Sequence, residues 1–379
     1  MFQLFPKRDS YDVVIVGSGA GGGMAAYELT KAGANVCVLE AGGPWDNTTD
    51  SAMFTWPWET DRRGGSTPER PFGEHDACIG GWNVEGEPFT TAPGTTFNWW
   101  RARMVGGRTN HWGRISLRFG PHDFKGKSRD GLGDDWPIGY DDLRPYYDDV
   151  DDLIGIFGSN EGLYNHPDGH FLPPPEPRCW EKVVKRAADK HSVTCIPSRL
   201  SIITRPHNGR PACHYCGQCN RGCAVNANFS STNVLLAPAA RTGRMTLLTN
   251  AMVREVTVGR DGLATGVVYI DKATGDERRV DARVVVLAAS ACESARILLN
   301  SKSSQFPQGL ANSSGVVGRY ITDSTGTDVG GFIPDLVDQP RHNCDGVGGA
   351  HLYMPWWLDN AKLDFPRGYH IEIWGGMGM

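Results

Sequence analysis

A glycine-rich turn near the N-terminus has the residue types and spacing of a nucleotide site. Residues 17–22 read Gly-Ser-Gly-Ala-Gly-Gly, after the apolar run 13–16 and before a helical pattern. Gly17 is expected to make the tight turn, Gly19 to let the backbone approach a pyrophosphate, and Gly22 to let the helix pack on the strand. The N–H groups of the helix N-terminus would then face the phosphates.

An acid follows the second apolar strand at the distance a dinucleotide site requires. Residues 35–39 are expected to form this strand, and Glu40 comes directly after it. A carboxylate here can accept hydrogen bonds from both ribose hydroxyls, which disfavours a 2′-phosphate. Glycine turns also occur in ordinary loops, but here strand, turn, helix, second strand and acid occur in the expected order. The sequence therefore predicts a dinucleotide site.

Four cysteines form a second group able to do chemistry. Cys213, Cys216, Cys219 and Cys223 have the spacing C-x2-C-x2-C-x3-C. Bacterial ferredoxins hold an iron–sulfur cluster with this spacing, although there a proline follows the fourth cysteine, which serves a second cluster. Structural zinc sites more often pair two separated CxxC knuckles. The run leaves open an iron–sulfur cluster, a zinc ion, and free thiols or a local disulfide.

Length and composition set wider bounds. The chain has 379 residues, enough for two or three domains, and a formal net charge of −5, which argues against a nucleic-acid partner. No run approaches the roughly 20 apolar residues of a membrane helix, and residues 1–10 do not resemble a secretory signal. We therefore expect a cytoplasmic protein with reduced thiols or metal ligands among its ten cysteines. Carriage to the periplasm by a partner subunit is the alternative.

The remaining pattern predicts the elements that position these residues. Helices are expected at 140–154, with its acids on a solvated face, and at 180–190. An Asp-Gly turn at 261–262 predicts a β-hairpin. The expected strands after the cysteines are 246–250, 252–258, 264–270, 277–280 and a separate buried strand at 283–289, followed by a helix.

Several segments, in order, resemble one enzyme family. Residues 105–112 (VGGRTNHW) are similar to the flavin-covering loop of glucose–methanol–choline (GMC) oxidoreductases, above all in the pyranose-oxidase and bacterial sugar-dehydrogenase branch. Residues 134–147, 226–238 and 288–299 resemble later family segments, although the lysine usual before Ser231-Thr232 is missing. The resemblance covers residue 11 to about residue 330.

The resemblance implies an α/β fold with a Rossmann-like FAD-binding domain of the glutathione-reductase type. It also implies a β-meander crossover and an interleaved α+β substrate domain. This substrate domain is expected to be incomplete here, because family members run longer. The implied parts are an FAD-binding domain at 10–45, 101–150 and 195–325, a lid at 46–100, a connecting segment at 151–194, and the start of the substrate domain at 326–379.

The resemblance also implies the cofactor contacts. Together with the glycine turn and Glu40, the expected FAD-binding residues are Gly17, Gly19, Ala20, Gly22, Glu40, Ala41, Gly106, Gly107, Thr109, Asn110, His111, Val253, Ala288, Ala289 and Glu293. In some relatives the histidine at the position of His111 is joined covalently to the flavin 8α-methyl. A covalent link, a non-covalent neighbour of the flavin and an unrelated core histidine all remain open.

The implied activity is FAD-dependent oxidation of a CH–OH group of a sugar, polyol or other alcohol, with hydride transfer to flavin N5. An iron–sulfur cluster would favour a dehydrogenase that passes electrons to a cytochrome c subunit or a quinone. The alternatives are an alcohol or sterol oxidase that uses dioxygen, and a non-catalytic electron-transfer subunit. The family's catalytic histidine pair has no match here. His351 and His370 qualify by residue type alone, so the catalytic residues are unassigned.

Overall fold

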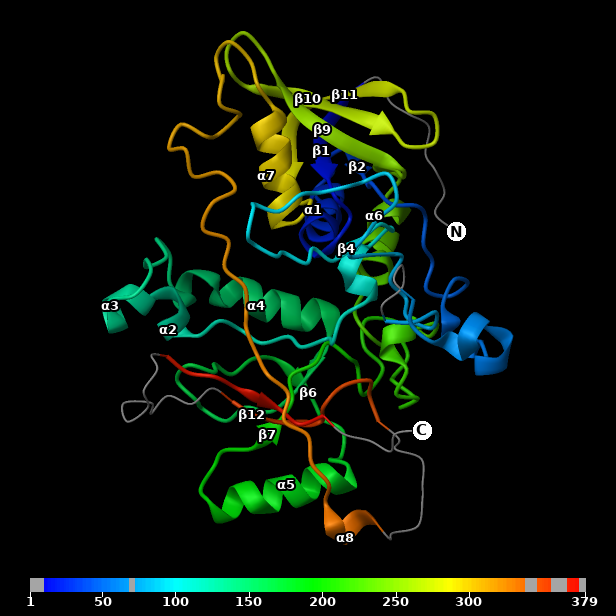
Figure 1. Cartoon of the computed structure of the whole chain (residues 1–379), viewed down its shortest axis with the longest axis vertical. Coiled ribbons are helices and arrows are strands. Elements are labelled where there is room, and N and C mark those ends of the chain that lie inside the picture. Colours follow the sequence, from blue (N-terminus) through cyan, green and yellow to red (C-terminus); the bar gives the residue numbers. More distant parts are fainter. Residues whose placement is uncertain (1–9, 68–71, 338–345, 356–366, 375–379) are drawn as a thin grey trace. The chain divides into compact units, whose positions relative to one another are not determined.

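The computed structural model describes residues 10–67, 72–337, 346–355 and 367–374 (Figure 1). The chain divides into two compact units. Unit 1 comprises residues 1–111 and 230–327, and unit 2 comprises residues 112–229 and 328–379. The chain passes between the units three times.

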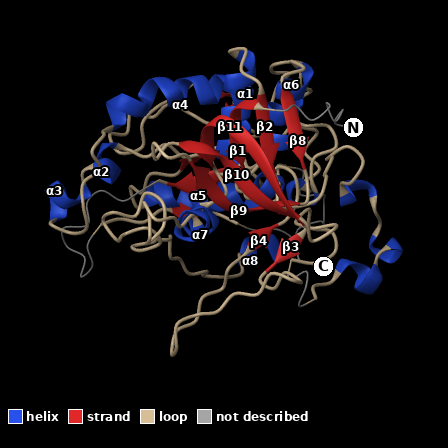
Figure 2. Ribbon diagram, turned by 90° about the horizontal axis from the view of Figure 1, so that it is seen from above, coloured by secondary structure: helices blue, strands red, loops and turns tan. Residues whose placement is uncertain are grey.

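Unit 1 is built on a parallel sheet that begins with the predicted strand–turn–helix–strand. β1 (Tyr11–Val16) leads through the glycine turn into α1 (Ala20–Lys31), and β2 (Val36–Leu39) pairs in parallel with β1. β8 (Met245–Leu248) extends the sheet beyond β2, also in parallel. Figure 2 shows β8, β2, β1 and β11 side by side. The predicted order of strand, turn, helix and strand is confirmed.

β11 (Glu277–Leu287) corrects one prediction, because a single strand replaces the two expected at 277–280 and 283–289. Its first half pairs antiparallel with β10 (Ala264–Asp271), and its second half pairs in parallel with β1. No glycine or proline interrupts residues 277–287, so nothing in the sequence breaks the strand. Its second half was also expected to be buried, but the side chain of Val284 is 51% exposed.

Val284 is exposed because it lies at an open edge of the sheet. Among the described residues, no strand pairs with residues 282–287 on the side opposite β1. The strands of a parallel sheet are normally buried, because other elements cover both faces of the sheet. The second half of β11 is therefore an edge that carries apolar side chains.

Two apolar layers cover the faces of this sheet. One contains Ala26 of α1 and Leu236 and Ala239 of the segment 232–241, packed against Ile15 and Val38. The other contains residues of the β-meander β9 (Ala251–Val258), β10 and β11, together with Ile297 of α7 (Ala291–Asn300). The predicted hairpin of β9 and β10 and the helix after β11 are confirmed.

Shorter elements complete unit 1. The excursion after β2 contains little regular structure, as expected. The short elements are η1 (Ala52–Phe54), η2 (Pro57–Glu59), η3 (Asp61–Gly64), β3 (Gly80–Gly81), β4 (Arg101–Ala102), η4 (Gly107–Asn110), η6 (Thr232–Leu236) and α6 (Ala237–Arg241).

Unit 2 contains the two predicted helices, α4 (Tyr140–Ile154) and α5 (Cys179–Lys190). Its largest sheet has the order β13-β12-β7. The other bounds are α2 (Pro121–Phe124), α3 (Gly126–Asp130), β5 (Ile156–Phe157), β6 (Phe171–Leu172), β7 (Ile196–Pro197), η5 (Cys219–Arg221), α8 (Pro334–Val337), β12 (Leu352–Met354) and β13 (Ile371–Glu372).

Asp151 of α4 corrects a second prediction, because it is buried rather than part of a solvated acidic face. Its carboxylate lies 2.5 Å from a guanidinium nitrogen of Arg118, which also pairs with Asp148. Burial raises the pKa of Asp151, while Arg118 opposes that shift. A buried carboxylate needs such a partner, because an unpaired one would pay a large desolvation cost.

The compact units and the implied domains divide the chain at different places. The segments 112–150 and 195–229, placed by resemblance with the FAD-binding domain, belong to unit 2. In the part of the chain that the structure describes, no helix has the length and apolar character needed to cross a bilayer.

Candidate cofactor site

The glycine turn has the geometry expected of a phosphate-binding turn. Gly17 has a φ of +96°, which favours glycine, and a Cβ on Gly22 would lie 1.9 Å from the carbonyl oxygen of Gly17. A Cβ on Gly19 would meet no atom within 4 Å, because it would project into open space. The turn therefore packs closely on the protein side and leaves room on the ligand side.

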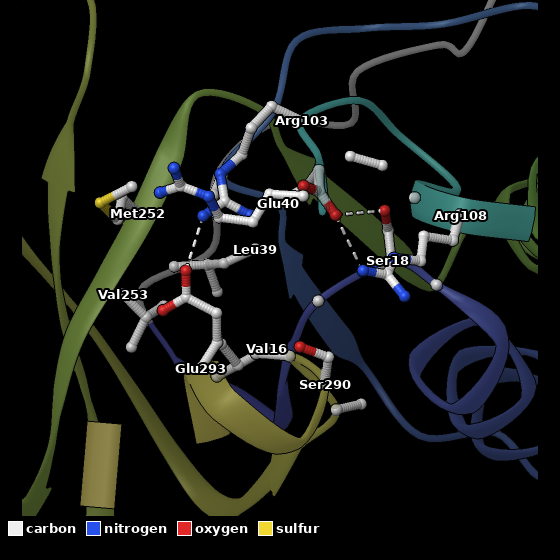
Figure 3. Close-up of a pocket in the computed structure, with 18 of the residues that line it drawn as sticks. Val16, Ser18, Leu39, Glu40, Arg103, Arg108, Met252, Val253, Ser290 and Glu293 are labelled. Carbon is white, nitrogen blue, oxygen red and sulfur yellow. Dashed lines mark hydrogen bonds and ion pairs between the residues drawn. The ribbon is translucent and has the colours of Figure 1, made fainter. Parts of the chain in front are cut away.

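Glu40 is anchored directly beside this turn (Figure 3). One carboxylate oxygen accepts hydrogen bonds from the backbone N–H of Ser18 at 3.1 Å and from its hydroxyl at 2.5 Å, and the other accepts from Gly42 N–H at 2.8 Å. Burial raises the pKa of Glu40, and these hydrogen bonds oppose the shift. Each carboxylate oxygen has two lone pairs, so acceptor capacity remains for a ribose.

A cavity of about 350 Å³ lies within unit 1 at the turn and Glu40. The carboxyl ends of β1 and β2, the β9 strand and the start of α7 surround it, as a topological switch point would. Most of the predicted FAD-binding residues line it: Gly17, Gly19, Ala20, Glu40, Ala41, Gly107, Thr109, Val253, Ala288, Ala289 and Glu293.

Gly22, Gly106, Asn110 and His111 were also predicted as cofactor contacts but do not line the cavity. Gly22 is the packing glycine of the turn. Gly106 has a φ of +86° and donates its N–H to the Ser18 hydroxyl at 2.9 Å. Asn110 is fully buried and donates from Nδ2 to the Val105 carbonyl at 2.8 Å. These contacts fix the loop that carries Gly107 and Thr109 into the cavity wall.

An ionic network that sequence reasoning missed borders the same cavity. Arg103 lies 2.6 Å from Glu293 and 2.7 Å from Glu87, and Glu293 lies 2.6 Å from Arg296. Lys272, in the turn after β10, contacts Glu87 at 2.7 Å. Burial alone would raise the pKa of Glu87, but Arg103 and Lys272 hold it below its usual value. The network ties the excursion after β2 to the cavity.

The signals for these residues were present but not specific. Arg101 and Arg103 directly precede the family-like loop, and Arg296 follows Glu293 by three residues on one helical face. Ser18 lies inside the glycine turn, where its hydroxyl contacts Glu40. Charge and spacing alone did not show which partners these side chains would meet.

His111 lies at the end of η4, two residues beyond Thr109. Its Nδ1 lies 2.5 Å from Oδ1 of Asp76. Its ring lies against Phe72, at 4.8 Å between ring centroids, and against Trp100, at 5.7 Å. Trp100 lines the cavity, although His111 itself does not.

The cysteine loop belongs to unit 2 and does not form a metal centre as it stands. Among the described residues, no group of three or more His, Cys, Asp or Glu side chains is arranged to hold a metal ion. Cys213, Cys216, Cys219 and Cys223 are free thiols. Burial raises the pKa of Cys213 to about 12 and also raises those of Cys216 and Cys219, which favours the protonated thiols.

Backbone N–H groups nevertheless donate to two of these four sulfur atoms. Tyr215 N–H donates to Cys213 Sγ at 3.3 Å, and Gly348 N–H donates to Cys219 Sγ at 3.4 Å. Cys219 is also in the apolar cluster of Phe157, Leu200 and Val347. Among the described residues these thiols are not grouped as a metal-ion site, so no electron-transfer step is derived through them.

The two candidate histidines of unit 2 have structural partners. His351 is buried; its Nε2 accepts from Val347 N–H at 3.1 Å, and its Nδ1 lies 2.7 Å from the Glu176 carbonyl. Both ring nitrogens are therefore used, and burial lowers its pKa. His370 lies on the surface 3.2 Å from Glu372. Neither contact points to a role as catalytic base.

The family model for GMC oxidoreductases matches residues 12–323. The chain therefore belongs to the GMC oxidoreductase family, as the motifs predicted. This match spans the glycine turn, the loop at 105–112 and the β-meander, which together build the cavity.

Named relatives include both dehydrogenases and oxidases. The chain is 33% identical to 2-methyl-1,2-propanediol dehydrogenase of Mycolicibacterium austroafricanum, over 97% of this chain and 64% of that protein. It is 31% identical to paromamine 6′-oxidase of Streptomyces fradiae, over 87% of this chain and 56% of that protein. It is 29% identical to the fructose dehydrogenase large subunit of Gluconobacter japonicus, with coverages of 84% and 59%. The chain spans about three fifths of these relatives' lengths.

Proposed function

We propose that unit 1 binds FAD and that the protein oxidises a CH–OH group of a small alcohol, polyol or sugar. The observation that carries the proposal is the cavity of about 350 Å³ built from the glycine turn, Glu40 and the β9 strand. The open space at Gly19 admits a pyrophosphate, and Glu40 is positioned for a ribose. We assign the fold of this unit to the Rossmann-like FAD-binding class.

Each wall of the cavity would hold one part of the cofactor. The N–H groups at the start of α1 would bind the pyrophosphate, and the backbone of Val253 would meet the adenine. The loop from Gly106 to His111 would lie beside the isoalloxazine, as the family resemblance implies. Bound flavin supplies a two-electron acceptor for hydride. We assign no catalytic base among the described residues.

The electron acceptor separates two candidate functions. We propose a dehydrogenase, which is the activity in the printed name of the relative at 33% identity. An oxidase that uses dioxygen is the alternative, because another relative is named as a 6′-oxidase. Substrate-dependent formation of hydrogen peroxide would identify the oxidase. Reduction of an artificial acceptor without peroxide would identify the dehydrogenase.

A partner that accepts electrons is part of the dehydrogenase proposal. One relative is named as a large subunit, which is consistent with a separate electron-accepting chain such as a cytochrome c. The iron–sulfur prediction at Cys213–Cys223 rests on spacing and on the N–H donors around the thiols. Iron and acid-labile sulfide analysis of anaerobically purified protein tests it, and absence of both would refute it.

We also propose that FAD is joined covalently to His111. The support is the position of the histidine two residues after Thr109, which lines the cavity, and the contact of its ring with Trp100, which also lines the cavity.

An anaerobic absorption spectrum tests the main proposal. Purified protein should show flavin bands, which should bleach when a suitable alcohol, polyol or sugar is added. A matched sample of Gly19→Ala, whose methyl group would occupy the open space in front of the turn, should retain less flavin. A protein that binds no flavin would refute the proposed function.

A further inference from the structure

Asp76 lies on the irregular excursion after β2, far in sequence from the loop of His111. It is buried, and its Oδ1 accepts the N–H of Cys78 at 2.8 Å, which fixes the carboxylate in place. The same Oδ1 lies 2.5 Å from Nδ1 of His111. Nothing in the glycine or loop motifs indicates this pair, because 35 positions separate the two residues in the sequence.

We propose that Asp76 is the positioning residue that prepares His111 for covalent attachment of FAD. This inference rests on the proposed function, and it concerns how the chain holds the histidine rather than whether FAD binds.

The contact with the carboxylate selects one tautomer of the ring. At 2.5 Å from a carboxylate oxygen, Nδ1 must carry a proton, because two facing lone pairs would repel. The neutral ring then has its lone pair on Nε2, which is the nucleophilic nitrogen. A histidine whose second nitrogen is held by a carboxylate is the usual arrangement for fixing tautomer and ring direction.

Aromatic side chains hold the ring at the same time. Phe72 and Trp100 lie at 4.8 and 5.7 Å between centroids, with planes tilted by 38° and 30° from that of His111. Since Trp100 and Thr109 both line the cavity, the ring is fixed at its margin. Ring orientation and tautomer are thus set by groups from two separate segments of unit 1.

The attachment step balances with dioxygen as the final oxidant. Nε2 of His111 forms a bond to the 8α-carbon as one C–H bond of that methyl breaks. The electron pair and proton of the C–H bond go to the isoalloxazine. Dioxygen later takes up this electron pair, this proton and the Nδ1 proton of the alkylated ring as hydrogen peroxide. His111 becomes positively charged when the bond forms, and the carboxylate of Asp76 stabilises this charge at close range.

The test measures attachment separately from binding. Native protein is assayed for total flavin, then precipitated with acid, and the flavin that stays with the pellet is read by absorbance and by intact mass. His111→Ala should bind FAD but leave none in the pellet. Asp76→Ala should keep its total flavin, but the fraction of flavin that stays in the pellet should fall at least tenfold. Asp76→Glu should restore part of that fraction. Glu85→Ala, an exposed carboxylate on the same excursion, should match the wild type.

Asp76→Asn guards against a folding defect, because its amide oxygen keeps the acceptor for Cys78 N–H while the charge is lost. It should also show slower attachment when FAD is added to flavin-depleted protein. Attachment in Asp76→Ala and Asp76→Asn equal to the wild type would overturn the inference, as would a wild type whose flavin is entirely extracted by acid. Absence of flavin from the native wild type would instead refute the proposed function.

Discussion

At the scale of single residues, two glycines of the nucleotide turn are needed for opposite reasons. Gly22 lacks a side chain because the Gly17 carbonyl oxygen occupies that space, 1.9 Å from where a Cβ would lie. Gly19 lacks one because a ligand needs the space in front of it. One glycine therefore serves the fold, and the other serves binding.

Alanine substitutions should separate these two roles. Gly22→Ala should lower the free energy of unfolding by about 1–3 kcal/mol, because backbone atoms must shift. Gly19→Ala should change it by less than about 1 kcal/mol, yet weaken FAD binding on the order of tenfold, or about 1.4 kcal/mol. Urea unfolding and flavin titration measure both, in the His111→Ala background so that binding is reversible. Equal losses of stability in the two variants would contradict this division.

The sequence predicted these glycines and Glu40 because their spacing reflects local backbone geometry. It did not predict Ser18, Arg103 or Asp76 as parts of the site. Their roles depend on contacts across 22 to 190 positions of sequence, such as the bond of Arg103 to Glu293. Local patterns contain no information about such pairs.

At the scale of elements, the excursion after β2 is tied to the cavity by one buried carboxylate. Glu87 contacts Arg103 and Lys272, each at 2.7 Å, while its side chain is only 8% exposed. Removing this carboxylate takes away one of the two partners of the largely buried Arg103, so the excursion loses an ionic contact with the cavity wall. The excursion should therefore loosen before the sheet beneath it does.

Glu87→Ala should speed the release of FAD roughly tenfold. The physical reason is that the excursion borders the cavity through Arg103, which would lose one of its two carboxylate partners. The measurement is flavin fluorescence after dilution, in the His111→Ala background. Glu85→Ala is the control, and equal release rates from the two variants would argue against the tie.

A buried histidine links the 160s loop of unit 2 to β12. His166 contacts the hydroxyl of Tyr353, and burial, aided by Arg199, lowers the pKa of His166 from 6.5 to about 3. The folded state keeps this ring neutral, while the unfolded chain takes up a proton below pH 6.5. Stability from this site is therefore present above that pH and is lost as the pH falls toward 3.

His166→Gln should remove this pH dependence. The difference in free energy of unfolding between wild type and variant should shrink steadily below pH 6.5. Urea titrations at a series of pH values measure it. His170→Gln is the control, because Asp152 raises the pKa of that exposed histidine and its dependence has the opposite sign. A constant difference for His166→Gln would contradict the expectation.

The elements themselves were largely predictable, with instructive exceptions. Helix 140–154 and the hairpin of β9 and β10 follow from periodicity and turn residues. β11 was divided in two because its pairing changes from antiparallel to parallel at residues 281–282, without a change in local sequence pattern. Asp151 was misplaced because its buried partner, Arg118, is 33 positions away.

At the scale of the whole molecule, the family motifs and the compact units divide the chain at different residues. Family motifs run almost continuously from residue 12 to 323, but the chain leaves unit 1 at 111 and returns at 230. The order of motifs along the chain identifies the family, whereas the limits of the compact units depend on contacts between residues distant in sequence. This is why the family could be predicted and the limits of the compact units could not.

The open edge of β11 has a consequence for behaviour in solution. Residues 283–287 read Arg-Val-Val-Val-Leu, and no strand of the described part of the chain pairs with their free side. Unpaired backbone groups along an apolar strand are a template for another molecule's strand. This chain should thus self-associate as its concentration rises. Val284→Lys, a gatekeeper charge on the exposed side chain, should lower light scattering several-fold. Leu263→Lys, the same charge at an exposed apolar side chain between β9 and β10, should not. Unchanged light scattering in Val284→Lys would show that self-association does not occur through the edge of β11.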